Sequence, residues 1–313
     1  MKKEFFESDI GESYVKATLD SGLQIFILEK PLYKSAYALF GTKYGSIDTA
    51  FSVDGIKTEV PEGIAHFLEH KLFESEDGDA FTKFAKTGAY ANAFTSFDKT
   101  CYLFSCSDNF YENLNILLDF VQSPYFTKET VEKEQGIIGQ EIRMYDDSPG
   151  WRVMFNMLMS MYHNHPVRID IAGTVESIAK IDYNLLFRCY NTFYNPSNMF
   201  ICIAGNVATD TCLKQIEESI KPSKAMELTR ITAEEPYEVV ENYTEQALEV
   251  AQPMFCFGFK EAYEGEISLK EKIVTSLLLG IISGEASPLY RDLTNEGLIN
   301  DEFDTEHFCG NGY

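Results

Sequence analysis

The chain has 313 residues, of which 45% are apolar and 24% are charged, a composition typical of a folded globular protein. This composition excludes disordered, collagen-like and small disulfide-stapled proteins, and the length favours two domains. Asp and Glu total 49 against 26 Lys and Arg, which gives a formal charge of -23. Such a charge argues against nucleic acid or an anionic membrane as a partner.

The sequence also bears on the cellular compartment. No run reaches the roughly 18 apolar residues that a membrane span needs, and no apolar core follows the first charged residues. The seven cysteines are odd in number and lie mostly in apolar stretches, so we expect buried free thiols rather than disulfides. We therefore predict a cytoplasmic protein that makes no membrane contact.

Hydrophobic periodicity and turn signals predict alternating strands and helices along most of the chain. A run of strands opens the chain, and a hairpin is joined by Phe97, Asp98 and Lys99. The predicted elements in chain order are strands within 12–46, helices 61–73 and 79–87, strands 90–96 and 101–107, helices 111–121, 128–145, 150–162, 174–180 and 183–193, strand 199–205 and helix 209–220.

A polar, weakly patterned segment divides the chain into two parts. We assign residues 1–220 to a first domain, 221–236 to a linker and 237–313 to the start of a second domain. A predicted strand at 252–259 and a helix at 269–282 repeat the order of the first domain's opening strand and helix, which suggests an internal duplication. Because the chain stops at residue 313, we expect the second domain to be incomplete.

Two of the five histidines lie four residues apart on the predicted helix 61–73. His66 and His70 therefore share one helical face, and both imidazoles can reach one metal ion. Zinc in a peptidase takes three protein ligands and leaves the fourth position to water. Glu69 neighbours this face and could take a proton from that water. The alternative is a pair of partly buried histidines without a metal.

The third ligand is expected on the predicted helix 128–145. Glu134 and Glu141 lie two turns apart and share its apolar face, whereas Glu132 points to the opposite side. A carboxylate on an apolar face is costly unless it is paired or bound to a metal. The spacing does not choose between Glu134 and Glu141, and a solvated acidic face remains the alternative.

The histidine motif is the first of several segments that occur in the order of a known family. They resemble the inverted (His-x-x-Glu-His) zinc metallopeptidases, that is, the pitrilysin, insulin-degrading enzyme and mitochondrial processing peptidase family, and are most similar to its processing-peptidase-like branch. The resemblance covers residues of about 15 to 207. Its segments are 63–73, 88–95, 134–142, 194–199 and 203–206.

The resemblance implies a role for each polar residue of the two helices. It implies that His66, His70 and Glu141 bind zinc and that Glu69 is the general base. It also implies that Glu134 is a supporting carboxylate of the catalytic site. The choice between Glu134 and Glu141 is thus made by the resemblance.

The resemblance further implies a fold and a way of binding substrate. The fold is α+β, with two homologous α/β domains in which helices cover an antiparallel sheet. Asn92, Ala93 and Phe94 are expected to bind peptide substrate as an added edge strand. A family segment that ends in Gly-Leu-x-Tyr has Asn300 here in place of the Tyr, so the substrate contacts of that segment are not carried over.

We therefore expect a zinc-dependent endopeptidase that hydrolyses unfolded peptides. Its expected partners are peptide substrates and a second subunit, in a homodimer or in a heterodimer with a related chain. The alternative is a non-catalytic or partner-dependent peptide-binding subunit of a two-chain complex. His163 and His165 lie two residues apart before a proline, so we expect a loop near the cleft rather than a second metal site.

Overall fold

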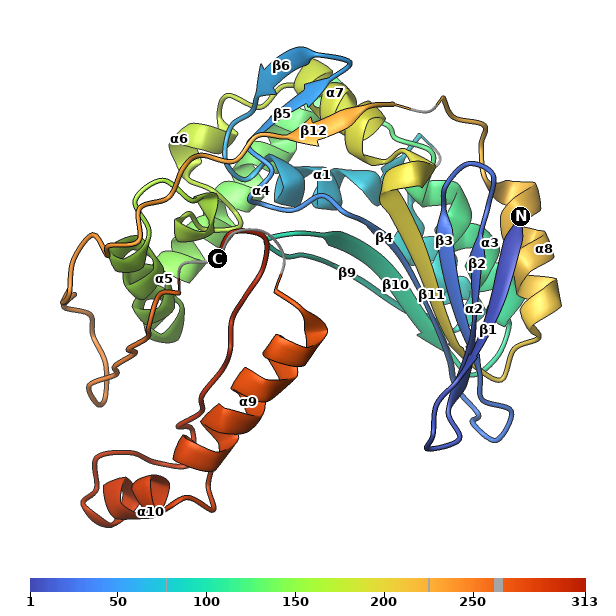
Figure 1. Cartoon of the computed structure of the whole chain (residues 1–313). Coiled ribbons are helices and arrows are strands. Elements are labelled where there is room, and N and C mark those ends of the chain that lie inside the picture. The colour runs from blue at the N-terminus through green and yellow to red at the C-terminus, as the bar shows by residue number, and fades with distance from the viewer. Residues whose placement is uncertain (77, 225, 262–266) are drawn as a thin grey trace.

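The computed structural model describes residues 1–76, 78–224, 226–261 and 267–313. A mixed seven-stranded sheet forms its centre, in the spatial order β1-β2-β3-β11-β4-β10-β9 (Figure 1). The parallel pair is β3 with β11, and the other neighbours in this sheet are antiparallel. The strands are β1 (Lys2–Glu7), β2 (Ser13–Thr18), β3 (Gln24–Glu29), β4 (Ala36–Thr42), β9 (Tyr90–Thr95), β10 (Thr100–Cys106) and β11 (Met199–Gly205).

Helices pack on one face of this sheet and enclose the main core. Burial alternates along β11, where Ile201 and Ile203 are buried and their neighbours are partly exposed, as expected of a strand with one packed face. Helix α1 contacts β9 and β10, α3 contacts β4 and β10, and α8 contacts β3. The helices around this core are α1 (Ile64–Leu72), α2 (Ala80–Thr87), α3 (Phe110–Val121), α4 (Lys128–Asp146), α7 (Tyr183–Phe193) and α8 (Thr209–Ser219).

Smaller elements surround the central sheet. A three-stranded sheet pairs β12 (Leu228–Arg230) with β5 (Ala50–Val53), and β5 with β6 (Ile56–Glu59). The segment 221–236, expected as a linker, therefore contributes a strand to a sheet of the first part. The other elements are β7 (Glu74–Ser75), β8 (Gly78–Asp79), α5 (Pro149–Met161), α6 (Val175–Ile178) and two 3-10 helices at Pro166–Arg168 and Pro196–Asn198.

The C-terminal part leaves much apolar surface exposed. Helices α9 (Leu269–Ser283) and α10 (Pro288–Asn295) project away from the seven-stranded sheet (Figure 1). On α9, Leu277 and Ile281 are 62% and 73% exposed. No single helix of the described residues is long and apolar enough to cross a membrane, although α9 and α10 taken together as a bent pair reach that length and composition.

Most predicted elements of the first 220 residues are confirmed, and one later prediction is wrong. The polar segment 47–60 contains β5 and β6, and the N-terminal strand β1 was not predicted. Residues 252–259 form no strand, because no described segment pairs with them, and Phe257 and Phe259 stay largely exposed. All seven cysteines are free thiols; four of them are buried, as expected, whereas Cys202 and Cys309 are partly exposed and Cys256 is exposed.

Candidate metal centre

Helix α1 presents the paired histidines from the middle of the core. It begins after Gly63, which adopts a left-handed conformation with φ of 84°, so the helix starts three residues later than predicted. Ile64, Phe67 and Leu68 are buried and fix the helix against the sheet. The 3.6-residue period then places His66 and His70 one above the other on the face toward α4.

Glu141 of α4 completes a cluster with the two histidines. The imidazole Nε2 atoms of His66 and His70 lie 3.2 Å apart. Carboxylate oxygens of Glu141 lie 3.6 Å from the first of these nitrogens and 3.5 Å from the second. One ligand atom from each of the three residues lies within 4.8 Å of the other two. Together they form a candidate metal site among the described residues.

The surroundings act on the two histidines in opposite directions. Glu134 accepts a hydrogen bond of 3.0 Å from Nδ1 of His70, which leaves the lone pair of Nε2 directed toward His66 and Glu141. Burial opposes the charged form of His70, but the hydrogen bond to Glu134 and nearby carboxylates raise its pKa overall. Burial and the neighbouring His70 lower the pKa of His66 to about 3, so its ring is neutral at pH 7.

Two imidazole nitrogens and a carboxylate oxygen are a donor set that zinc accepts in peptidase sites. Two nitrogen lone pairs that converge at 3.2 Å would repel each other unless a cation or a proton lies between them. The Nδ1 atom of His66 is buried and has no hydrogen-bond partner among the described residues, so packing and not a hydrogen bond at Nδ1 sets the orientation of this ring. The residues present therefore fit a zinc ion.

Glu69 lies beside the cluster and is held by the neighbouring strand. Its side chain is buried, and burial raises its pKa, while His70 and Thr95 act in the opposite direction. The hydroxyl of Thr95, at the end of β9, donates a hydrogen bond of 2.9 Å to Oε2 of Glu69. The other carboxylate oxygen, Oε1, remains available to a water or substrate.

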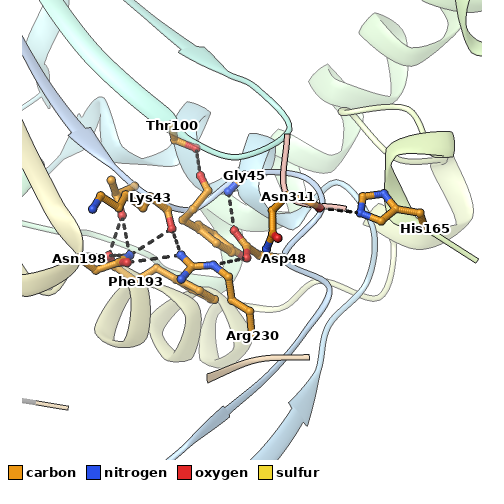
Figure 2. Close-up of polar contacts among 11 residues, drawn as sticks. Lys43, Gly45, Asp48, Thr100, His165, Phe193, Asn198, Arg230 and Asn311 are labelled. Carbon is orange, nitrogen blue, oxygen red and sulfur yellow. Dashed lines mark hydrogen bonds and ion pairs between the residues drawn. The ribbon is translucent and has the colours of Figure 1, made fainter. Parts of the chain in front are cut away.

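Contacts behind β9 support Thr95. Thr100 of β10 donates a hydrogen bond of 2.8 Å to the Tyr44 carbonyl oxygen and lies 3.5 Å from the Thr95 hydroxyl. The loop that carries Tyr44 is held in turn by Arg230 of β12 (Figure 2). The Arg230 guanidinium donates to Asp48 at 2.7 Å and to the Lys43 carbonyl oxygen. Strand β12 thus belongs to the support of the site.

The buried Asp48 carboxylate is the centre of this loop. It accepts hydrogen bonds from Arg230 and from the Gly45 backbone N–H at 2.9 Å (Figure 2). Burial raises its pKa, although Arg230 works in the opposite direction. Because the Arg230 side chain binds both Lys43 and Asp48, the loop 43–48 and the β12 strand are fixed together.

The residues expected to bind substrate lie on an edge of the seven-stranded sheet. Strand β9 is the outermost strand beside β10, and along it Asn92 and Phe94 are exposed while Ala93 is half-buried. The Asn92 side chain accepts a hydrogen bond of 2.9 Å from the backbone N–H of Ala93. Because β9 has a neighbouring strand on one side only, its outer edge offers backbone groups to an extended peptide, and the Ala93 N–H would have to exchange its bond to Asn92.

A cavity of about 330 Å³ joins the metal cluster to this strand. Its walls come from α1, β9, α4, α5 and the loop that follows the 3-10 helix at 166–168. Carboxylates outnumber cationic groups along it, so a cation is favoured there. The lining residues are His66, Glu69, His70, Ala93, Phe94, Thr95, Glu141, Tyr145, Trp151, Asp170, Ile171 and Ala172.

His163 and His165 lie in a loop, as predicted, but they do not line this cavity. His165 is buried, and its Nε2 lies 3.1 Å from the Asn311 carbonyl oxygen near the end of the chain (Figure 2). Its ring also contacts Tyr313 at a centroid distance of 5.2 Å. Among the described residues these two histidines form no metal cluster.

The structure adds functional candidates that the sequence did not single out. Thr95 contacts Glu69, Tyr145 contacts Glu141, and Trp151 and Asp170 line the same cavity. The spacing of four residues between Glu141 and Tyr145 on one helix was a signal for the second contact. For Thr95 and Asp170 the contacts join segments that are distant in the sequence, and no local pattern marks them.

Comparison with known protein families agrees with this geometry. The model of the family described as insulinase (peptidase family M16) matches residues 57–175, and the model described as the peptidase M16 inactive domain matches residues 180–303. His66, His70 and Glu141 all lie in the first of these segments. The candidate metal centre is therefore contained in the insulinase match.

Curated relatives are described as zinc proteases. YmfH of Bacillus subtilis, described as an uncharacterised zinc protease, is 45% identical to this chain. The alignment is 322 residues long and covers 100% of this chain and 75% of YmfH. YmxG of the same organism, described in the same way, is 28% identical over 89% of this chain and 66% of its own length. The chain thus spans about three quarters of YmfH and about two thirds of YmxG.

Solved structures show the same fold. The crystal structure of a protein described as an M16-like peptidase from Alicyclobacillus acidocaldarius superposes with a TM-score of 0.90 at 38% identity, covering 96% of this chain and 72% of that one. A protease from Helicobacter pylori superposes with a TM-score of 0.69 at 18% identity, which supports the fold alone. The expected α+β fold is confirmed.

Proposed function

Because the chain belongs to the M16 (insulinase) family of peptidases, we propose that it is a zinc-dependent endopeptidase that hydrolyses unfolded peptides. The observation that carries the proposal is the convergence of His66, His70 and Glu141, with ligand atoms within 4.8 Å, beside the Glu69 carboxylate. The zinc protease descriptions of the relatives support the same metal.

Each residue of the site has a role in this reaction. His66, His70 and Glu141 hold the metal, which when bound supplies a Lewis acid for the scissile carbonyl and lowers the pKa of a water. Glu69 accepts a proton from the attacking water at Oε1, the oxygen that Thr95 leaves free, and returns it to the leaving amine.

The edge strand supports unfolded peptides as the substrate class. A peptide that adds to β9 must be extended so that its backbone can pair with the strand. Because β9 also lines the cavity through Ala93, Phe94 and Thr95, such a peptide would pass beside the metal cluster. Most segments of a folded protein already pair their backbone groups, so an unfolded peptide can add to this edge more readily than a folded protein can.

The proposal is tested by incubating the zinc-loaded protein with a mixture of unstructured peptides and identifying cleavage products by mass spectrometry. We expect cleavage by the wild type, a loss of at least about 100-fold in Glu69→Gln, and full zinc content in that variant. We expect His70→Ala to lose both zinc and cleavage. Undiminished turnover by Glu69→Gln, or stoichiometric zinc in His70→Ala, would refute the assigned roles.

A second candidate is a subunit that binds peptide but needs a partner chain for catalysis. Two observations favour it: the inactive-domain match at residues 180–303, and the exposed apolar side chains of the C-terminal part, such as Phe259 and Leu277. Burial of such a surface stabilises a subunit contact. This alternative predicts that the chain alone does not cleave peptides and that cleavage appears when a related subunit is added and a dimer mass is observed. Cleavage by the monomer would contradict it.

A further inference from the structure

The three ligand side chains of the candidate metal centre are not held in the same way. Glu134 fixes the ring of His70 through Nδ1. Packing, which includes an edge contact with the His70 ring, constrains the ring of His66, whose Nδ1 has no partner among the described residues. Glu141 has three side-chain torsions against two in each histidine, and its side chain is partly exposed. A flexible side chain loses more conformational freedom on binding a metal, so its orientation needs support.

Tyr145 gives Glu141 this support from one turn further along α4. Its hydroxyl donates a hydrogen bond of 2.8 Å to Oε1 of Glu141. The spacing of four residues places the two side chains on one face of the helix. A carboxylate oxygen has a second lone pair, and Oε2 accepts nothing from Tyr145, so the contact leaves the carboxylate able to bind a metal.

Tyr145 is itself held by α5 and the loop beyond it. Its ring stacks on the Trp151 indole at a centroid distance of 4.7 Å and an interplanar angle of 19°. The indole N–H donates to Oδ2 of Asp170, and Oδ1 of Asp170 accepts a hydrogen bond of 2.9 Å from the Ala172 backbone N–H. A carboxylate bound on both oxygens fixes the indole, and the stacked indole restricts the tyrosine ring.

The same loop packs backbone to backbone against the start of α1. A Cβ on Gly63 would lie 2.4 Å from the Ala172 carbonyl oxygen, which is closer than side chains allow. The Ser177 hydroxyl donates a hydrogen bond of 2.9 Å to the Glu62 carbonyl oxygen beside it. The contacts therefore form a closed path from the histidine helix, through Asp170, Trp151 and Tyr145, to the glutamate ligand.

We propose that Tyr145 is a positioning residue that holds the Glu141 carboxylate in the orientation that binds the metal, with Trp151 and Asp170 as its support. The inference rests on the proposed zinc site and adds to it residues outside the ligand set. Partners that orient a ligand typically change metal affinity by about 10-fold to 100-fold when they are removed. Tyr145→Phe removes the hydroxyl and keeps the ring that stacks on Trp151.

The test measures zinc affinity of the full chain by competition with a chromophoric chelator, using zinc alone as the probe. We expect Tyr145→Phe to bind zinc about 10-fold to 100-fold more weakly than the wild type, with an unchanged melting temperature of the metal-free protein. Tyr190→Phe is the matched control, because Tyr190 also lies on a helix, stacks on another ring and donates its hydroxyl to an oxygen, that of Val121. Its zinc affinity should equal that of the wild type.

A double-mutant cycle separates positioning from a general effect on folding. If Tyr145 acts through Glu141, Tyr145→Phe should have no further effect on zinc affinity in a Glu141→Gln background. Wild-type affinity in Tyr145→Phe, or an equal loss in both backgrounds, would overturn the proposal. A wild type that binds no zinc would overturn the proposed function together with this inference. The zinc affinity of the wild type is therefore measured first, before any variant is compared.

Discussion

Glu235 anchors the segment after β12 to the loop before the 3-10 helix at 166–168, and its replacement by Gln should loosen that anchor. Its carboxylate accepts hydrogen bonds of 2.6 to 2.8 Å from the backbone N–H groups of His163, Asn164 and His165. Lys260 donates to the same carboxylate at 2.5 Å. The Glu235 and Lys260 side chains are 11% and 4% exposed.

The expected loss follows from the pKa of this carboxyl. Burial opposes ionisation, but Lys260 and the three backbone donors lower the pKa of Glu235 from its ordinary 4.5 to about 2. This difference corresponds to about 3 kcal/mol of stabilisation of the ionised form. Because glutamine keeps a carbonyl oxygen that can still accept hydrogen bonds from the backbone, the expected loss of stability is smaller, about 1 to 2 kcal/mol.

The sign of the pH dependence distinguishes this mechanism from a packing defect. A carboxyl whose pKa is lowered by folding contributes its full stabilisation above pH 4.5 and loses it progressively as the pH falls toward about 2. Glutamine does not titrate. The difference in melting temperature between the wild type and Glu235→Gln should therefore be largest at neutral pH and shrink below about pH 5.

The assay is thermal unfolding of both proteins across this pH range, with hydrogen exchange of the loop amides at pH 7. Faster exchange of the His163, Asn164 and His165 amides in Glu235→Gln is expected, because they lose their ionised acceptor. Glu234→Gln, at the neighbouring position, is the control for removal of one negative charge. A stability difference that does not change with pH, or unchanged exchange at these amides, would refute the reasoning.

Three further predictions concern the site and the core. Glu134→Gln should weaken zinc binding by about 10-fold, because His70 loses its ionised acceptor, as measured by chelator competition; unchanged affinity would contradict this. Thr95→Val should reduce peptide cleavage with full zinc content and Thr95→Ser should restore it, since the hydroxyl holds Glu69; equal rates in both variants would argue against that role. Phe84→Ala should cost about 3 to 5 kcal/mol in denaturant unfolding, because Phe84 is 1% exposed and packs on two rings; a loss below about 1 kcal/mol would be inconsistent with this packing.

The sequence by itself determined the local elements and the spacing of residues within them. The apolar period of 63–73 predicts a helix, and the period of 3.6 residues alone places His66 and His70 on one face. The alternation in 90–96 and 101–107 predicts the hairpin of β9 and β10 in the same way. These predictions held because each depends on residues within one or two turns of each other along the chain.

The choice of the third ligand lay beyond such local patterns. Glu134 and Glu141 share one face of α4, so spacing alone left both possible, and only the resemblance to a family separated them. In the structure Glu134 contacts the outer nitrogen of His70, while Glu141 lies against the inner nitrogens of both histidines. The position of α4 against α1 decides this, and that position depends on packing between segments that are distant in the sequence.

Tertiary structure also decides which segments become strands, because a strand needs a neighbouring segment to pair with. Residues 51–53 and 228–230 carry little pattern of their own and become β5 and β12 by pairing with each other, whereas the apolar residues 252–259 have no described partner and form no strand. Tyr145, Trp151 and Asp170 meet for the same reason. A strand or a supporting contact needs two segments at once, and the sequence of one segment does not specify where the other lies.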